Sequence, residues 1–257
     1  MTGSAIDRLR SVLLDVPRTT KPRVGGVTMM LDKGLGPAEV ESLTDVAADH
    51  IDYAKIAWGS SLITRDLERK LELYRARDVI PTLGGSLFEY AHLRGQVEPL
   101  LDFVKEAKLS IELSDSICHI SRRDKLAWIE RFAAHGRVLS EVGRKTEQVD
   151  QPWTQRIADE IEAGAEKIVI EGREIGPASG EFRSDLVEQM VSEFPAEKLI
   201  FEALERKQQV SLIKQLGPDV NLGNILPHDV LTVESFRRGL KEHTLLHMHD
   251  RVSRSAL

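Results

Sequence analysis

The sequence of 257 residues contains a single cysteine, Cys118. One cysteine excludes an internal disulfide and a zinc site built on several thiolates, and we expect Cys118 to be a small structural residue. Long apolar stretches are also lacking, since no run approaches the roughly 18–20 residues of a membrane-spanning helix. Residues 1–8 show no basic region followed by an apolar one, so no secretory signal is expected. These absences predict a soluble, cytoplasmic protein with no membrane partner.

An excess of basic residues is absent too. The chain has 35 lysines and arginines against 41 aspartates and glutamates, which gives a formal net charge of −6. Nucleic-acid binding generally needs a basic face, so we expect no nucleic-acid partner. The 41% of hydrophobic residues are enough for a large core in a chain of this length. The sequence leaves a homo-oligomer open.

What the chain does contain is a repeating order of short apolar runs, polar or glycine-bearing turns and helical patterns. Predicted strands cover Gly26–Leu31, Tyr53–Ala57, Val79–Leu83, Ser110–Leu113, Arg137–Val142, Lys167–Ile170, Lys198–Phe201 and Val220–Leu222. Predicted helices cover residues 37–48, 61–76, 86–107, 121–135, 151–164, 183–193, 206–216 and 228–240. Eight strand–helix units predict an α/β fold of the (β/α)₈ TIM-barrel type. We expect residues 1–257 to form one such domain, with a short N-terminal helix and a C-terminal tail.

The alternative α/β architecture is an open sheet that binds a dinucleotide. No Gly-x-Gly-x-x-Gly turn follows the first predicted strand, and this absence disfavours the open sheet.

Charged residues follow the predicted strand Lys167–Ile170, in the stretch Glu171-Gly172-Arg173-Glu174-Ile175-Gly176. Carboxylates and a guanidinium at the end of a buried strand are costly unless they are paired or hold a ligand. For one strand alone, an ion-pair network is the simpler interpretation. Several other strands end in the same way, however, and catalytic groups in such barrels come from the C-terminal ends of the strands. The pattern therefore predicts a functional site at that end.

Alternation along each strand indicates which side chains share a face. The inward set predicted from this parity is Thr28, Met30, Asp32, Lys55, Glu112, Ser114, Glu141, Gly143, Lys145, Glu171, Arg173 and Glu202, with Asn221 and Asn224 at the end of the last strand. A barrel interior is usually filled by valine, isoleucine and leucine. Folding alone does not require so many ionisable groups.

Four of these inward residues are acids on different strands, namely Glu112, Glu141, Glu171 and Glu202. Clustered carboxylates repel one another without a cation between them, and oxygen ligands of this kind suit Mg²⁺. We expect Glu112, Glu141 and Glu171 to hold the metal ion. The alternative is a self-neutralising network with the inward cations, and both arrangements can coexist.

Cations near the strands give enough positive charge to bind a phosphate or a carboxylate, despite the acidic total. They are Lys21, Arg23, Lys33, Lys55, Lys145 and Arg173. Glycines within 84–86 and 176–180 leave backbone N–H groups free near helix starts, an arrangement that suits an anion but equally a tight turn. Trp58 is expected to pack against the core or to form a wall of the site.

Six motifs occur in order along the chain: Lys21-Pro22-Arg23, Thr28-Met29 with Asp32-Lys33-Gly34, Lys55-Ile56-Ala57-Trp58-Gly59, Glu141-Val142-Gly143-Arg144-Lys145, Glu171-Gly172-Arg173-Glu174 and Asn221-Leu222-Gly223-Asn224-Ile225. From about residue 21 to residue 239, the chain resembles the phosphosulfolactate synthase family. The resemblance implies a (β/α)₈ barrel and a carbon–sulfur lyase or synthase. It also implies Mg²⁺-dependent addition of sulfite to phosphoenolpyruvate, giving (2R)-phospho-3-sulfolactate. In methanogens that reaction opens a route to coenzyme M, and elsewhere it can supply sulfolactate.

The implied chemistry suggests a role for each site residue. Sulfite attacks C3 of the enol phosphate, negative charge develops at C2 and on the carboxylate, and an acid then protonates C2. Lys145 is predicted to be this acid because its parity places it beside Glu141, and an anion ligand is the alternative role. Catalytic roles are thus predicted for Lys145, Glu141 and Arg173. Substrate binding is predicted for Lys21, Arg23, Lys33, Lys55, Arg173, Asn221 and Asn224.

Two segments depart from the family's pattern. The chain has Ser114-Asp115-Ser116 where the family tends to have Ser-Asp-Gly, and Lys241-Glu242-His243 where it tends to have an arginine followed shortly by Asp-Thr. We expect the second departure to remove a charge pair near the barrel mouth. The alternative functions are a related barrel enzyme that uses another nucleophile or phosphorylated substrate, and a non-catalytic stress or interaction barrel. His243 and His247 share a helix face, but the sequence implies no third metal ligand.

Overall fold

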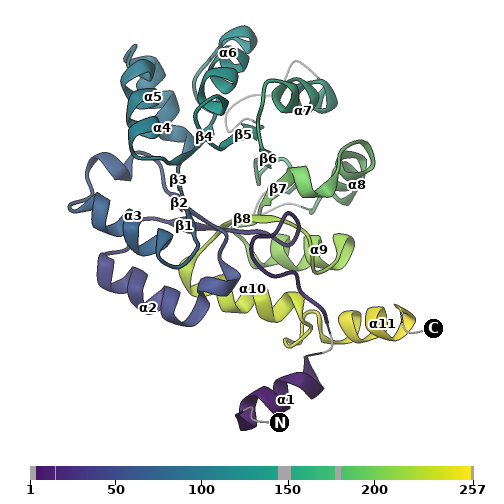
Figure 1. The fold of residues 1–257 in the computed structure, drawn as a ribbon. Helices are drawn as coiled ribbons and strands as arrows, with labels where there is room; N and C mark the ends of the chain where they lie inside the picture. The colour runs from purple at the N-terminus through teal and green to yellow at the C-terminus, as the bar shows by residue number, and fades with distance from the viewer. Residues whose placement is uncertain (1–3, 15, 144–151, 177–180, 256–257) are drawn as a thin grey trace.

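The computed structural model describes residues 4–14, 16–143, 152–176 and 181–255. Eight parallel strands form a closed barrel in which each strand pairs with its neighbour in the sequence and β8 returns to β1 (Figure 1). The strands are β1 Thr28–Asp32, β2 Tyr53–Ile56, β3 Ile80–Leu83, β4 Ser110–Leu113, β5 Val138–Val142, β6 Lys167–Ile170, β7 Leu199–Glu202 and β8 Leu222–Ile225. The predicted (β/α)₈ barrel is confirmed.

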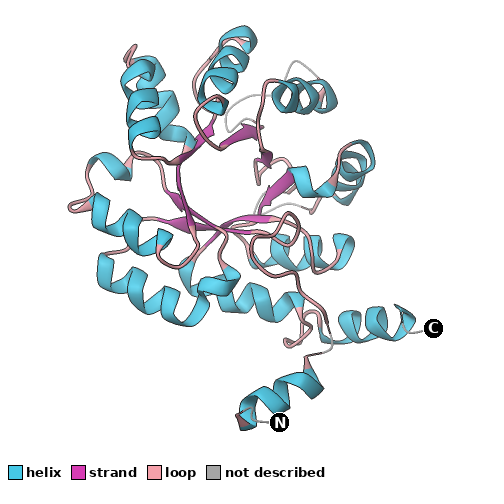
Figure 2. Ribbon diagram, in the orientation of Figure 1, coloured by secondary structure: helices cyan, strands magenta, loops and turns pink. Residues whose placement is uncertain are grey.

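Helices surround the barrel on its outer side, as Figure 2 shows by colour. They are α2 Pro37–Ala47, α3 Leu67–Arg75, α4 Gly85–Leu93, α5 Val97–Glu106, α6 Arg122–Ala133, α7 Trp153–Glu162, α8 Ser184–Glu193, α9 Arg206–Leu216 and α10 Val230–Arg237, with α1 Ala5–Leu13 and α11 Leu245–Ser255 near the chain ends. Both α1 and α11 lie outside the ring, on the same side of the molecule (Figure 1).

Several predicted elements have other bounds in the structure; the helix predicted at 61–76, for example, begins at Leu67. The helix predicted at 86–107 is divided into α4 and α5, because Gly95 adopts a left-handed conformation (φ +63°) that a continuous helix does not permit. The last strand begins at Leu222 rather than Val220. Asn221 lies before it and uses its side chain to bind the backbone, accepting from Val27 N at 2.9 Å and donating to Leu199 O at 2.9 Å.

Inside the barrel, apolar side chains fill the half nearer the N-terminal ends of the strands. This barrel plug consists of Val27, Met29, Tyr53, Leu139, Val169 and Ile200, each almost fully buried. Gly223 makes room for it, because a Cβ there would lie 2.9 Å from Met29 Cε and 3.0 Å from Ile200 Cγ2. A larger, separate core packs the outer face of the strands against the helices.

The inward charged residues stand two positions after plug residues on the same strands. Lys55 follows Tyr53, Glu141 follows Leu139, Glu171 follows Val169 and Glu202 follows Ile200. Since side chains two apart share a face of a strand, the plug fixes these charged groups as the next layer toward the C-terminal mouth. The predicted alternation matches the structure on these four strands.

The alternation predicted for the first strand is wrong. Met29 belongs to the barrel plug and Met30 to the outer core, so Thr28, Met30 and Asp32 face the helices. Asp32 is buried against α3, where Lys70 Nζ lies 2.6 Å from its Oδ2 and Tyr74 donates a hydrogen bond of 2.8 Å to the same oxygen. The first strand contributes Leu31 to the interior instead.

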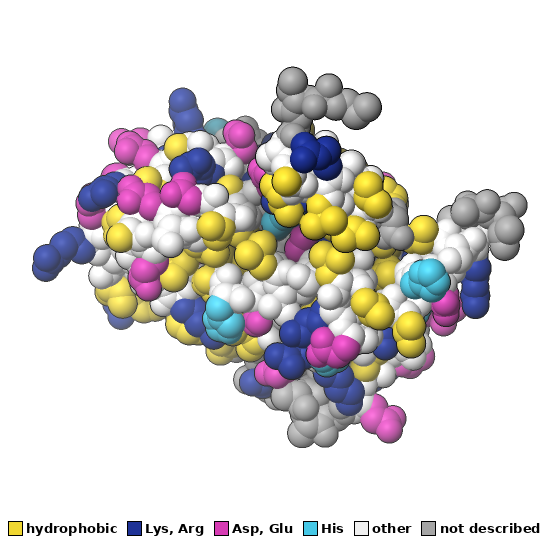
Figure 3. All heavy atoms as spheres, turned by 90° about the horizontal axis from the view of Figure 1, so that it is seen from below, with side chains coloured by type: hydrophobic (Ala, Val, Ile, Leu, Met, Phe, Trp, Pro, Cys, Tyr) yellow, Lys and Arg dark blue, Asp and Glu magenta, His cyan; other side chains and the backbone are white. Residues whose placement is uncertain are grey.

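Among the described helices, none has the length and apolar character that crossing a membrane requires. Figure 3 shows one side of the molecule, where apolar side chains lie among charged side chains of both signs.

Candidate active site

Three glutamates meet at the C-terminal mouth of the barrel. Glu112 on β4, Glu141 on β5 and Glu202 on β7 each offer one carboxylate oxygen, and these oxygens all lie within 4.8 Å of one another. All three side chains are buried. We call these three residues the acid cluster. In the part of the chain that the structure describes, it is the one group of three or more potential metal ligands so close together.

Lys55 supplies the cation inside the acid cluster. Its Nζ lies 2.7 Å from Glu112 Oε2 and donates a hydrogen bond of 3.1 Å to Glu202 Oε1. Burial acts to lower the pKa of Lys55, but the neighbouring carboxylates of Glu112, Glu202 and Glu141 outweigh it and raise that pKa. Lys55 is therefore an ammonium ion at neutral pH.

The pKa of Glu112 reflects the crowding of carboxylates in the acid cluster. Its burial, helped by repulsion from Glu141 and Glu202, raises the pKa of Glu112 to about 7 although Lys55 acts to lower it. The acid cluster gathers three carboxylates around the single ammonium of Lys55. Carboxylate oxygens are the ligands that Mg²⁺ prefers. The residues present therefore fit this metal ion.

A cavity of about 320 Å³ opens beside the acid cluster, and we call it the mouth cavity. Its lining includes Leu31, Lys33, Trp58, Glu171, Arg173, Glu202, Gln208 and Asn224. Trp58 forms part of its wall, with Lys33 Nζ 6.0 Å from the centroid of the indole ring. The cavity thus combines three carboxylates, those of Glu171, Glu202 and Glu205, with two exposed cations, Lys33 and Arg173.

The backbone of the mouth is strained at two strand ends. Trp58 and Asn224 both have a φ of 55°, which is unusual for residues with a side chain. Such conformations persist where the surrounding structure holds them, and they are concentrated at functional sites. The loop after β6 is held by Gln208 on α9, which donates to Gly172 O and Gly176 O, both at 2.9 Å.

Further buried side chains position the acid cluster. Gly85 N donates to Glu112 Oε1 at 3.1 Å, and Lys125 Nζ donates to the backbone oxygen of Glu141 at 2.7 Å. Glu89 holds the loop after β4, where it accepts hydrogen bonds from Ser114 Oγ at 2.7 Å and from Ile117, Cys118 and Ser116. Sequence reasoning missed these supporting roles because Glu89, Lys125 and Gln208 lie on helices, away from the strand ends that it searched.

The structure brings seven of the predicted site residues to the mouth, namely Lys33, Lys55, Glu112, Glu141, Glu171, Arg173 and Asn224. Glu171 lines the mouth cavity, but it is not a member of the acid cluster, whose third member is Glu202. Lys145 lies outside the described residues, so its role stays a prediction.

Three of the residues predicted to bind substrate lie at the opposite end of the barrel. Lys21 and Arg23 precede β1, and Asn221 precedes β8, which places them at the N-terminal ends of the strands. Arg23 Nε pairs with Asp52 Oδ1 at 3.1 Å, just before β2. The structure does not bring these three side chains together with the acid cluster.

The departure at Lys241–His243 also lies away from the mouth, which corrects the expected position of the lost charge pair. These residues follow α10, and Arg237 near the end of that helix donates to Pro218 O and Val220 O, both at 2.6 Å, ahead of β8. Ser116, in the other departure, donates its hydroxyl hydrogen bond to Glu89. The tail histidines, His243 among them, form no group of three potential metal ligands in the described chain.

Comparisons with known proteins agree with this architecture. A statistical model of the family described as (2R)-phospho-3-sulfolactate synthase (ComA) matches residues 16–243. The chain is 37% identical over 250 residues to a phosphosulfolactate synthase of Methanothermobacter thermautotrophicus, covering 90% of this chain and 96% of that protein. It is 34% identical over 244 residues to a phosphosulfolactate synthase of Bacillus subtilis, covering 90% and 97%. A solved 3-hexulose-6-phosphate synthase from Salmonella typhimurium has a TM-score of 0.54 at 12% identity, covering 86% of this chain and 99% of that one, a likeness of fold alone.

Proposed function

Because this chain belongs to the (2R)-phospho-3-sulfolactate synthase family, we propose that it forms a carbon–sulfur bond by adding sulfite to C3 of phosphoenolpyruvate. The product would be (2R)-phospho-3-sulfolactate. The observation that carries the proposal is the acid cluster with its buried counter-ion Lys55, next to a cavity that holds two further cations. This is a site for an anionic substrate whose negative charge shifts during reaction.

The mouth cavity has the size for the substrate, and two of its lining residues are cations. Its volume of about 320 Å³ is in the lower range of small-molecule sites. Arg173 and Lys33 would bind the phosphate, since both line the cavity and a guanidinium matches phosphate oxygens with two parallel hydrogen bonds. Asn224 would orient the bound anion through its amide.

We further propose that Glu112, Glu141 and Glu202 would hold Mg²⁺. The ion would supply positive charge next to the substrate carboxylate, where it stabilises charge that develops during addition. Lys55 would keep Glu112 and Glu202 ionised and oriented toward that position. Burial of the acid cluster strengthens these electrostatic effects because water does not screen them.

Proton transfer completes the reaction. The sulfur lone pair of sulfite forms the bond to C3, and the π electrons of the enol double bond move to C2 and its carboxylate. A proton then adds to C2. We propose Lys145 as the donor because it follows Glu141 at the end of β5.

The direct test supplies phosphoenolpyruvate and sulfite, with and without Mg²⁺, and follows the phosphorus NMR spectrum. The expected result is a new phosphate ester signal that depends on sulfite, on the enzyme and on Mg²⁺. A folded enzyme that leaves phosphoenolpyruvate unchanged under these conditions would refute the proposal. Turnover with another nucleophile in place of sulfite would favour the related barrel enzyme.

A further inference from the structure

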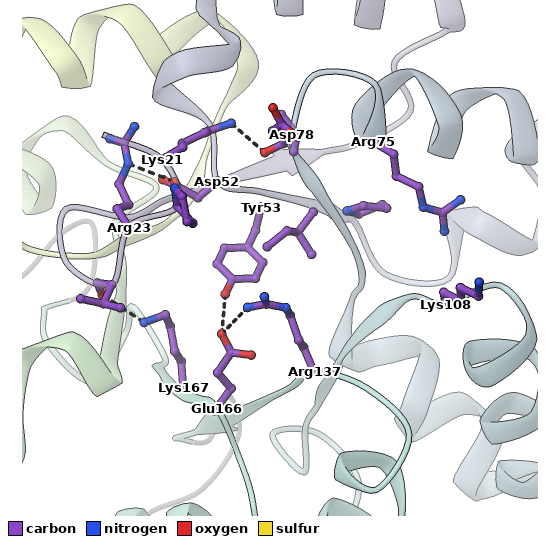
Figure 4. A pocket seen from close by; sticks show the side chains of 15 residues that line it. Lys21, Arg23, Asp52, Tyr53, Arg75, Asp78, Lys108, Arg137, Glu166 and Lys167 are labelled. Carbon is purple, nitrogen blue, oxygen red and sulfur yellow. Dashed lines mark hydrogen bonds and ion pairs between the residues drawn. The ribbon is translucent and has the colours of Figure 1, made fainter. Parts of the chain in front are cut away.

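A second and larger cavity lies at the other end of the barrel, with a volume of about 770 Å³. It is lined by residues at the N-terminal ends of the strands and in the loops that lead into them, so we call it the base cavity. Figure 4 shows Tyr53 of the barrel plug at its centre, with charged side chains arranged around the ring. The barrel plug separates this cavity from the mouth cavity.

The base cavity is cationic although the chain as a whole is acidic. Six lining residues are basic, namely Lys21, Arg23, Arg75, Lys108, Arg137 and Lys167. Three are acidic, namely Asp52, Asp78 and Glu166. The lining therefore has a surplus of three positive charges in a chain whose formal net charge is −6. Such local concentration of one sign inside a concave surface attracts ions of the other sign.

Two of the cations are neutralised within the cavity. Arg23 Nε lies 3.1 Å from Asp52 Oδ1, and Arg137 Nη1 donates to Glu166 Oε1 at 2.7 Å. The same oxygen of Glu166 accepts a hydrogen bond of 3.1 Å from the Tyr53 hydroxyl. These pairs are balanced, so the positive surplus comes from the other basic residues, Lys21, Arg75, Lys108 and Lys167.

Lys21 and Lys167 bind backbone oxygens rather than carboxylates. Lys21 Nζ donates to Asp78 O at 2.9 Å, while Lys167 Nζ donates to Val24 O at 3.1 Å and to Glu197 O at 2.7 Å. In the described part of the chain, neither lysine makes an ion pair with a carboxylate. Burial lowers the pKa of both ammonium groups, so each is charged at an energetic cost that a nearby anion would relieve.

We propose that the base cavity is a second binding site of this protein, and that its ligand is a small phosphate monoester. A phosphate group carries between one and two negative charges at neutral pH and presents three acceptor oxygens, which suits Lys21 and Lys167, while Arg75 lines the opposite side of the cavity (Figure 4). Pro22, Val79 and Pro81 give the cavity an apolar wall for the organic part of the ligand. The ligand is not consumed there, because the acid cluster lies beyond the barrel plug.

Binding at this site would also stabilise the fold. Lys21 belongs to the segment before β1, whereas Lys167 begins β6 and Lys108 precedes β4. A ligand that contacts these residues joins parts of the chain that are far apart in the sequence. Ligands that bind only the folded state raise its free energy of unfolding.

The test measures binding of inorganic phosphate and of glycerol phosphate to the full chain by titration calorimetry, at constant ionic strength. The mouth cavity also attracts phosphate, so the titrations are made in an Arg173→Met background that weakens that site. We expect saturable binding in this background. Adding Lys21→Met should raise the dissociation constant at least about tenfold, the usual effect of losing one hydrogen bond to a charged group. Adding Lys105→Met, an exposed lysine on α5 outside both cavities, should leave it unchanged.

A second variant, at the exposed edge of the base cavity, covers the case in which Lys21→Met does not fold. Lys108→Glu reverses an exposed charge at the base cavity, and it should weaken binding even if Lys21→Met proves unstable. Far-ultraviolet circular dichroism verifies the fold of each variant. Binding that is absent in the Arg173→Met background, or no stronger than that of chloride, would overturn the proposal. Binding that Lys21→Met and Lys108→Glu both leave unchanged would do the same.

Discussion

Lys55 Nζ lies 2.7 Å from Glu112 Oε2, with both side chains buried at the barrel mouth. The two residues come from β2 and β4, so the ion pair spans the barrel interior from one strand to the next but one. In the proposed function, Lys55 balances one carboxylate of the acid cluster and Mg²⁺ would bind between the carboxylates. The pair would then link the stability of the barrel to the occupancy of its site.

Replacing Lys55 by methionine should reveal this linkage. Lys55→Met leaves the buried carboxylates without their internal cation, and we expect a loss of about 3–5 kcal/mol in the free energy of unfolding without divalent ions. Mg²⁺ should restore more stability to the variant than to the wild type, because loss of the Lys55 ammonium makes the acid cluster more negative. Urea denaturation with and without Mg²⁺ measures both effects. Equal stabilisation of the two proteins by Mg²⁺ would contradict the proposed metal position.

The acid cluster includes only one of two glutamates that have the same inward parity, Glu202 and Glu171. If Mg²⁺ binds at Glu112, Glu141 and Glu202, Glu202→Gln should abolish most of the Mg²⁺-dependent rise in melting temperature. Glu171→Gln is the matched control and should keep most of that rise, since Glu171 is not in the cluster. The reverse order of the two variants would return the metal to the position predicted from the sequence.

The raised pKa of Glu112 predicts a pH dependence of stability. The pKa of Glu112 is 4.5 in the unfolded chain and about 7 in the folded one, so between these values the folded state binds more protons. Its contribution to stability is fully present below the lower value and is lost as the pH rises through the upper one. Without Mg²⁺, the free energy of unfolding of the wild type minus that of Glu112→Gln should fall across this window. A difference that stays constant with pH would rule out the raised pKa.

Arg173 provides a test of anion recognition. Arg173→Lys keeps the charge but loses the planar pair of N–H groups, so we expect a higher Michaelis constant for the phosphorylated substrate with little change in stability. Arg183→Lys serves as the control, because Arg183, just before α8, is exposed and pairs with Asp185 in the first turn of that helix. Steady-state kinetics of both variants measure this effect. If the Michaelis constant of Arg173→Lys matches that of Arg183→Lys, Arg173 has a purely structural role.

Lys145 is tested as the proton donor. Lys145→Ala should lower turnover by roughly 10²–10⁴-fold, the usual contribution of a general acid, while phosphoenolpyruvate still binds. A small primary amine should then restore part of the rate. Single-turnover measurements at saturating substrate distinguish the two roles: near-normal rates with weakened binding would make Lys145 an anion ligand instead.

The sequence was sufficient to predict the barrel because each apolar strand and each helix has its own local signal. Boundaries failed where a side chain bonds to the backbone or a residue is left-handed, as at Asn221 and Gly95. Alternation placed Lys55, Glu141 and Glu202 inside the barrel, because on these strands the charged residue has the parity that faces the interior. It failed on β1, where the charged residue Asp32 lies on the outer face and contacts Lys70 and Tyr74.

Parity alone does not give the position of a side chain along the barrel axis. Lys21 and Arg23 were predicted at the substrate site because of their charge, yet a residue that precedes a strand lies at its N-terminal end. Glu171 and Glu202 have the same parity and both lie near the mouth, but only three-dimensional geometry shows that Glu202 completes the acid cluster. Distances between strands thus decide what the order of residues leaves open.

The barrel plug closes the interior of the barrel, so the mouth cavity does not continue through to the N-terminal ends of the strands. Val27, Met29 and Tyr53 are too tightly packed to hold a column of water along the axis. Substrates, product and the proton delivered to C2 would therefore share one entrance. A ligand in the mouth cavity would lie against Glu202 of the acid cluster, on the side from which solvent also enters.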